Sequence, residues 1–210
     1  MKITIIGAAG QIPSYLIPML QKQTDAQLTL FARQATQRLL GFSNPCVRII
    51  DGDATKANDV KMAITDADVV FMDFDGPEAI KNVITVMDQL AKKRLIVAGL
   101  LGVFDEVAGA FGKWNNSMIG SGYRPHKQAV TALENSDLDY TYLRMTWLYN
   151  QDGNTRYEIQ KKGQPLIGAQ VTRQAISQYV IDLIQDPKLG IREANAVVEP
   201  NTNFAKPSFY

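Results

Sequence analysis

The chain alternates short apolar runs with segments of helical periodicity, and this alternation limits the folds open to it. Apolar runs typical of strands stand at residues 2–6, 27–31, 47–50, 69–72, 95–97 and 138–145. Helices are predicted at residues 77–92, 125–135 and 172–185. Strands separated by helices form βαβ units. The sequence therefore predicts an α/β fold with a doubly wound parallel sheet covered on both faces.

The length of 210 residues fits a single domain, with a strand-and-helix core over residues 1–145. Residues 100–121, rich in glycine and aromatic side chains, and residues 146–210 depart from the regular alternation. Turn signals such as DGN, KKGQP and EPNTN mark the second segment. Ligands of open α/β sheets bind beyond the carboxyl ends of the strands, so we expect these segments to add a small substrate-side cap and a C-terminal helix.

Composition argues against several classes of partner. The 22 basic and 21 acidic side chains are mixed along the chain and give a net charge of +1, which favours neither nucleic acid nor an anionic membrane. The longest apolar stretch, residues 95–104, falls short of the roughly 20 residues that span a bilayer. Cys46 and His126 are too few for a disulfide framework or a zinc site, so we expect no metal. We expect a soluble protein of the reducing cytoplasm.

The first strand ends in a glycine turn with the sequence GAAGQIP, residues 7–13. Gly7 and Gly10 leave unhindered backbone where a pyrophosphate could approach the N–H groups of the next helix. Pro13 stands where such turns have a third small residue, and it falls in the first helical turn, where a missing N–H breaks no intrahelical bond. The turn predicts a dinucleotide site; the alternative is an ordinary strand-to-helix turn in a fold with another ligand.

Arg33 follows the second strand, twenty residues beyond Pro13, where dinucleotide folds place the side chain that meets the adenosine ribose. An acidic residue there would favour NAD, whereas arginine suits the 2′-phosphate of NADP, and Arg38 is a second cation nearby. Asp53 follows the third strand, where a carboxylate can reach an adenine amino group. Two alternatives stay open: Arg33 as a solvated turn residue, and Asp53 as part of an Asp-Gly turn.

Six segments stand in order along the chain: GAAGQI, FAR, GDAT, ADVVFMDFDG, LGVFDE and SDLDYTYLR. Together they resemble the atypical short-chain dehydrogenase/reductase proteins of the NmrA-like, NAD(P)-binding kind, a group that includes biliverdin/flavin reductase. The resemblance implies a Rossmann-like domain, and with Arg33 the expected cofactor is NADP rather than NAD. The implied cofactor-binding residues are Gly7, Ala9, Gly10, Gln11, Ile12, Arg33, Asp53 and Ala54, with Asp73, Phe74 and Asp75 near the nicotinamide-side ribose.

Typical short-chain dehydrogenases transfer protons through a serine after the fifth strand and a Tyr-x-x-x-Lys pair. Gly99 and Leu100 stand at the serine position, so no hydroxyl is expected there. Tyr123 and Lys127 have the spacing of this Tyr-x-x-x-Lys pair. Pro125, however, favours a helix that begins after Tyr123, which would take the two side chains off a common helical face. The match is either this catalytic pair or a coincidence.

His126 takes the lysine position when the chain is spaced as its relatives are. A histidine that titrates near neutral pH could donate a proton or bind ribose or phosphate oxygens, and the alternative is a solvent-facing residue at a helix start. Trp114, Asn115 and Asn116 could line a substrate pocket or anchor the loop after the fifth strand. Tyr123, His126 and Lys127 are therefore the candidate catalytic residues.

The function expected from these features is that of an NADP(H)-binding oxidoreductase that reduces a small carbonyl, quinone or flavin acceptor by hydride transfer. Transfer to a stacked acceptor needs orientation more than a dedicated protein acid, so the missing serine does not exclude it. A redox-silent NAD(P)-sensing regulator of the NmrA type, with a protein partner, is the first alternative. An epimerase or dehydratase is the second, although the chain is short of a substrate domain.

Overall fold

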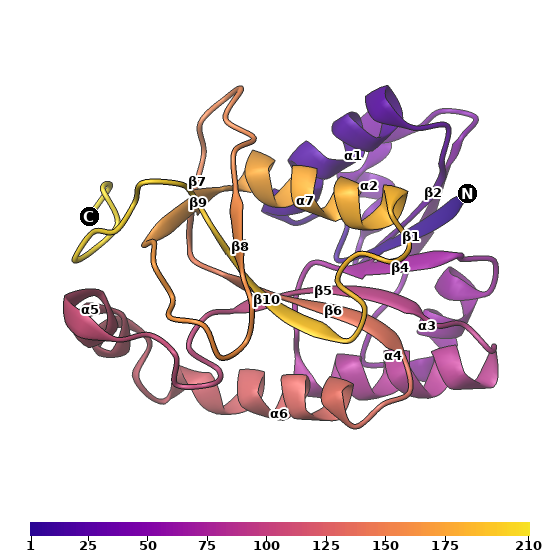
Figure 1. Cartoon of the computed structure of the whole chain (residues 1–210). Coiled ribbons are helices and arrows are strands. Elements are labelled where there is room, and N and C mark those ends of the chain that lie inside the picture. Colours follow the sequence, from indigo (N-terminus) through magenta and orange to yellow (C-terminus); the bar gives the residue numbers. More distant parts are fainter.

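The computed structural model describes residues 1–210, and its centre is an eight-stranded sheet (Figure 1). The strands of the chain are β1 (Lys2–Ile6), β2 (Gln27–Ala32), β3 (Val47–Asp51), β4 (Val69–Met72), β5 (Arg94–Leu100), β6 (Asp139–Met145), β7 (Trp147–Tyr149), β8 (Glu158–Gln160), β9 (Gln170–Thr172) and β10 (Glu193–Val198). The sheet order is β3-β2-β1-β4-β5-β6-β10-β8, in which only β8 is antiparallel to its neighbour. The predicted doubly wound, Rossmann-like sheet is confirmed.

Helices cover both faces of this sheet (Figure 1). On one face lie α1 (Gln11–Gln23) and α7 (Arg173–Gln185), and on the other lie α3 (Ala57–Ile64), α4 (Pro77–Gln89) and α6 (Tyr123–Glu134). The chain also forms α2 (Ala35–Arg38), α5 (Gly109–Ile119) and the short 3₁₀ turns η1 (Leu40–Phe42) and η2 (Gly120–Gly122). None of these helices is both long and apolar enough to cross a membrane.

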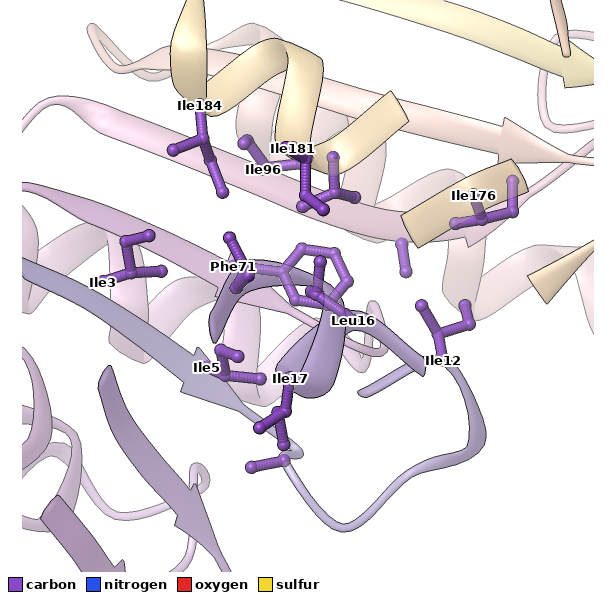
Figure 2. Close-up of a cluster of buried hydrophobic side chains, with 14 of the residues drawn as sticks. Ile3, Ile5, Ile12, Leu16, Ile17, Phe71, Ile96, Ile176, Ile181 and Ile184 are labelled. Atoms are coloured by element: carbon purple, nitrogen blue, oxygen red, sulfur yellow. The ribbon is translucent and has the colours of Figure 1, made fainter. Parts of the chain in front are cut away.

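The two cores follow from the alternation of side chains along each strand. Ile3 and Ile5 of β1 point into the core under α1 and α7 (Figure 2). Ile6 belongs to the core under α3, α4 and α6. On α1, Leu16 and Leu20 lie one turn apart and pack against the first core. Full burial of each such side chain contributes about 1.5–3 kcal/mol to the free energy of unfolding. The two cores therefore fix the positions of the strand ends, from which the turns and loops leave the sheet.

The structure corrects one prediction of secondary structure and adds elements in the two segments that depart from the regular alternation. Residues 100–121 contain the helix α5, which the low helix propensity of Gly109 and Gly112 conceals in the sequence. Residues 146–210 add the strands β10 and β8 to the main sheet, while β7 and β9 form a separate two-stranded sheet. The helix α6 begins at Tyr123 rather than after it, because Pro125 is tolerated in a first turn whose N–H groups have no intrahelical partner.

Candidate functional site

A cleft of about 440 Å³ lies where β1, β2, β3 and β4 end, and we call it the glycine-turn cleft. It brings together eight of the eleven residues predicted to bind a cofactor. Of the other three, Gln11 is exposed in the first turn of α1, Ile12 is buried in the core, and Asp75 is buried immediately after Phe74 in the chain. The lining residues are Ile6, Gly7, Ala9, Gly10, Phe31, Ala32, Arg33, Arg38, Gly52, Asp53, Ala54, Thr55, Asp73 and Phe74.

The glycine turn is fixed by backbone hydrogen bonds and has no room for larger residues. The N–H groups of Gly7 and Ala8 both donate to the carbonyl of Phe31, at 2.9 and 3.1 Å. Gly7 has a φ of 82°, a left-handed conformation that favours glycine. A Cβ on Gly10 would lie 1.8 Å from Oδ2 of Asp73, closer than two atoms can approach. The turn therefore keeps bare backbone facing the cleft.

The helix α1 begins at this turn without a side-chain cap, because its N-cap residue is Gly10. The N–H groups of Gln11 and Ile12 have no partner within the helix, and Pro13, the third helical residue, has no N–H to satisfy. Pro13 lies in the first turn as predicted. The uncapped N-terminus combines free N–H donors with the positive end of the helix dipole, an arrangement that suits a phosphate.

Two arginines, Arg33 and Arg38, line the cleft. Arg33 is exposed directly after β2, and Arg38 of α2 donates to the carbonyls of Arg33 and Ala9 at 3.3 and 3.1 Å. Asp53 faces them, and its Oδ1 accepts hydrogen bonds from both N and Oγ1 of Thr55 at 2.9 Å, which lower the pKa of the carboxyl. Asp53 is thus engaged in a local turn through Oδ1, while its Oδ2 makes no hydrogen bond within the chain.

Asp73 lies against the glycine turn in the middle of the cleft. Its Oδ1 is buried and has no hydrogen-bond partner, and burial raises the pKa of this carboxyl to about 8, although the charge of Arg173 acts in the opposite direction. The side chain is therefore mostly uncharged at neutral pH. A neutral carboxyl beside the N-terminus of α1 does not repel an anion, so the middle of the cleft remains suited to phosphate.

A hydrogen-bonded chain of three side chains lies beyond the cleft. Nδ1 of His126 donates to the Asp75 carboxylate at 2.7 and 2.9 Å, and the Tyr142 hydroxyl donates to Oδ2 of the same carboxylate at 2.6 Å. The bond to Asp75 raises the pKa of His126, and burial raises that of Tyr142. Asp75 is 5% exposed, whereas the side chain of His126 is 33% exposed. The Asp75 carboxylate thus favours the imidazolium form of His126, whose Nε2 makes no hydrogen bond within the chain.

The hydroxyl that the sequence lacks at Gly99 and Leu100 is supplied from β6. The Tyr142 hydroxyl accepts a hydrogen bond from the N–H of Leu100 at 3.1 Å. A Cβ on Gly99 would lie 2.3 Å from that same hydroxyl and 2.0 Å from the ring. The expectation of no hydroxyl at this position is therefore wrong. Gly99 is glycine because the Tyr142 side chain fills the space of residue 99's own side chain.

A second cavity, of about 380 Å³, lies where β5 and β6 end, and we call it the aromatic cavity. Most of its wall is apolar, and it contains a single charged side chain, Arg173. Phe209 and Tyr210 from the end of the chain form part of the wall, where Tyr210 packs on Trp147 and Trp114 with ring centroids 5.2 and 5.1 Å away. The lining residues are Gly99, Leu100, Leu101, Ile119, Met145, Thr146, Trp147, Leu148, Arg173, Phe209 and Tyr210.

The side chains of the Tyr-x-x-x-Lys match, and those of Trp114 and Asn115, contact neighbouring residues rather than the two cavities. The Tyr123 hydroxyl bonds to Asn115 and Asn116, and Lys127 pairs with the exposed Asp105 at 2.8 Å. Trp114 stacks in the aromatic cluster without lining the cavity. Asn115 is fully buried and accepts a hydrogen bond from Nε1 of Trp147 at 2.8 Å. Trp114 and Asn115 belong to α5 and anchor this helix to Trp147 and Tyr210, so of the two alternatives left open by the sequence their contacts favour anchoring.

Sequence reasoning missed Tyr142, Arg173 and the ion pair between Glu106 and Arg144. The Arg144 side chain is 1% exposed and that of Glu106 is 8%, and their charged groups lie 2.8 Å apart. Glu106 also accepts the N–H groups of Gly102 and Phe104, which fixes the loop after β5. Glu106, Tyr142 and Arg144 lie within the segments LGVFDE and SDLDYTYLR, and Arg173 stands at a helix start, but nothing in the sequence marks the distant partners of these side chains.

Comparison with known proteins identifies the family. A family model described as NAD(P)H-binding matches residues 7–187, most of the chain. The chain belongs to the NAD(P)H-binding family. The resemblance to atypical short-chain dehydrogenase/reductase proteins that six motifs predicted is thereby confirmed.

Two solved structures and one curated protein show how this NAD(P)H-binding protein relates to others. A short-chain dehydrogenase/reductase from Veillonella parvula DSM 2008, in complex with NADP, is 32% identical with a TM-score of 0.95 over 99% of both chains. A Rossmann-fold NAD(P)-binding family protein from Shigella flexneri is 30% identical, with a TM-score of 0.81 over 100% of this chain and 98% of that one. The 4-hydroxy-tetrahydrodipicolinate reductase of Aliarcobacter butzleri (strain RM4018) is 34% identical over 98 residues, 46% of this chain but 34% of that protein's length.

Proposed function

We propose that this protein is an NADPH-dependent oxidoreductase that reduces a small planar acceptor, a quinone, flavin or conjugated carbonyl. One observation carries the proposal: the glycine-turn cleft and the aromatic cavity lie at the same edge of one sheet, at the ends of the paired strands β4 and β5. Neighbouring strands are about 4.8 Å apart, so ligands in the two spaces can be brought into contact. The cleft is polar and glycine-rich, as a dinucleotide requires, and the cavity is apolar, as a planar acceptor requires.

The residues of the cleft fit the cofactor. Gly7, Gly10 and the free N–H groups of α1 would hold the pyrophosphate, where a Cβ on Gly10 would collide with Asp73. Arg33 and Arg38 would pair with a 2′-phosphate, which supports NADP over NAD, as does the NADP complex of the Veillonella relative. Bound NADPH supplies a hydride, which is two electrons and one hydrogen nucleus.

The acceptor also needs a proton, and His126 is the residue best suited to provide it. Its bond to Asp75 stabilises the imidazolium, and Tyr142 holds Asp75 in place while accepting from Leu100, which lines the aromatic cavity. One hydride and one proton reduce the acceptor by two electrons, and His126 is reprotonated from solvent through its exposed edge.

The test is consumption of NADPH by the purified chain with menadione, FMN and 4-nitrobenzaldehyde. We expect at least one acceptor to be reduced, with one NADPH oxidised for each two-electron reduction. Tight binding of NADPH without turnover of any acceptor would contradict the proposal. That result would favour a redox-silent dinucleotide sensor, which would then have to change its binding of a partner protein with the redox state of the cofactor.

Replacing Arg33 by alanine is expected to weaken NADPH binding by about ten- to a hundredfold, because a charge-assisted hydrogen bond to phosphate contributes about 1.5–3 kcal/mol. Binding of NADH should be unchanged, since it has no 2′-phosphate. Thermal-shift titrations with the four dinucleotides measure both. Arg48→Ala is the matched control, since Arg48 is also exposed but lies outside the cleft. Equal NADPH affinity in Arg33→Ala and wild type would refute the choice of cofactor.

A further inference from the structure

The aromatic cavity has one charged side chain, and that side chain lacks a counter-ion. Arg173 is partly buried at the start of α7 and makes one hydrogen bond, from Nη1 to Oδ1 of Asn150 at 2.9 Å. Its Nε is buried and has no partner in the chain. Buried donors are almost always hydrogen-bonded in folded proteins, and neither Nε nor Nη2 of this guanidinium has a partner, so the arginine in the cavity wall has donor capacity left for a ligand group.

No acidic side chain neutralises this arginine. Arg173 forms no ion pair with any carboxylate, and Asp73, the acidic residue that acts on it, has its pKa raised to about 8 by burial. Arg173 therefore has no carboxylate within ion-pair distance.

The remaining wall is suited to a flat apolar body. Leu100, Met145, Leu148, Trp147 and Tyr210 line it together with Arg173, and the volume of about 380 Å³ is near the lower end of the range for small-molecule sites. A cavity of that size holds one or two rings rather than a large conjugated chain. Arg173 is partly buried, so an ion pair formed with it is less screened by water than one on the surface, which strengthens it.

We propose that the aromatic cavity takes a planar conjugated carboxylate of one or two rings, with its carboxylate on Arg173 and its rings on the apolar wall. This inference rests on the proposed function, because it names the substrate class of the same site. Arg173 would accordingly be the residue that sets specificity for acidic over neutral acceptors.

The experiment compares 2-naphthoate with 2-naphthamide, which have the same rings and differ in charge. Binding is measured by calorimetry on the full chain, alone and saturated with NADP⁺. We expect wild type to bind the naphthoate about tenfold or more tightly than the amide, a difference typical of a charge-assisted hydrogen bond. Arg173→Gln should bind the two equally, and Arg173→Lys should retain part of the preference because it keeps the charge.

Arg156→Gln is the matched control, since Arg156 is an exposed arginine outside the cavity, and it should behave as wild type. Equal binding of the two compounds by wild type, or a preference that survives in Arg173→Gln, would overturn the proposal. An Arg173→Gln variant that loses NADPH affinity by as much as it loses naphthoate affinity would also overturn it, by assigning the arginine to a cofactor phosphate. None of these measurements requires turnover, so they stand apart from the test of reductase activity.

Discussion

Replacing Glu106 by alanine is expected to lower the free energy of unfolding by about 3–5 kcal/mol, since it leaves the Arg144 guanidinium buried without its counter-ion. The same change removes the acceptor for the N–H groups of Gly102 and Phe104, and so loosens the loop that leaves β5 beside the aromatic cavity. Urea unfolding followed by far-UV circular dichroism measures the loss, provided that the transition remains two-state.

Two further variants test whether the loss of stability in Glu106→Ala comes from the unpaired buried charge or from a general weakening of the fold. Glu134→Ala removes the partner of Lys162, an exposed pair that contributes at most about 1 kcal/mol, and should unfold almost as wild type does. The double variant Glu106→Leu, Arg144→Met removes both buried charges and should regain much of the stability lost in Glu106→Ala. Equal losses of stability in Glu106→Ala and Glu134→Ala would show that burial of the pair adds nothing to the cost of removing its carboxylate.

The sequence predicts well those helices and strands whose bounds are determined by local sequence patterns. β1 and β4 match their predicted bounds, and α4 and α7 match to within a few residues, because their apolar periodicity and their Pro77 or Thr172 starts are local signals. The glycine turn and Arg33 were found in the same way, since a turn after a strand and a residue after the next strand have fixed places in this architecture.

The parts that were missed depend on contacts between distant segments. Tyr142 reaches Asp75 across 67 positions of sequence, and Arg144 reaches the carbonyl of Ala194 across 50. Each residue fits its strand equally well whether or not such a partner exists, so periodicity cannot reveal the pairing. Gly99 is the clearest case: in the sequence it is the absence of a serine, and in the structure it is the space that lets Tyr142 bring a hydroxyl to the same position.

Replacing His126 by glutamine is expected to lower kcat/KM of the proposed reductase by about 10²- to 10⁴-fold, the usual contribution of a general acid. A proton donor must be protonated, so kcat/KM of wild type should fall as pH rises through the pKa of His126, which its bond to Asp75 raises above 6.5. Asp75→Asn removes the charge that raises this pKa and should move the falling limb to lower pH. Steady-state kinetics across pH, with NADPH saturating and the best acceptor of the panel, measure both effects.

Comparison with neighbouring positions of α6 decides whether His126 or the Tyr-x-x-x-Lys match supplies the proton. Gln128→Ala alters an exposed residue of the same helix that makes no side-chain hydrogen bond, and should leave the kinetics unchanged. Tyr123→Phe and Lys127→Met test the rival pair, whose members instead contact Asn115 and Asp105. A loss in these two variants as large as that in His126→Gln, or a pH profile that Asp75→Asn does not shift, would assign the proton to the pair and leave His126 a structural ligand of Asp75. We expect the opposite, because only His126 has a buried carboxylate to stabilise its charged form and a free nitrogen from which the proton can leave.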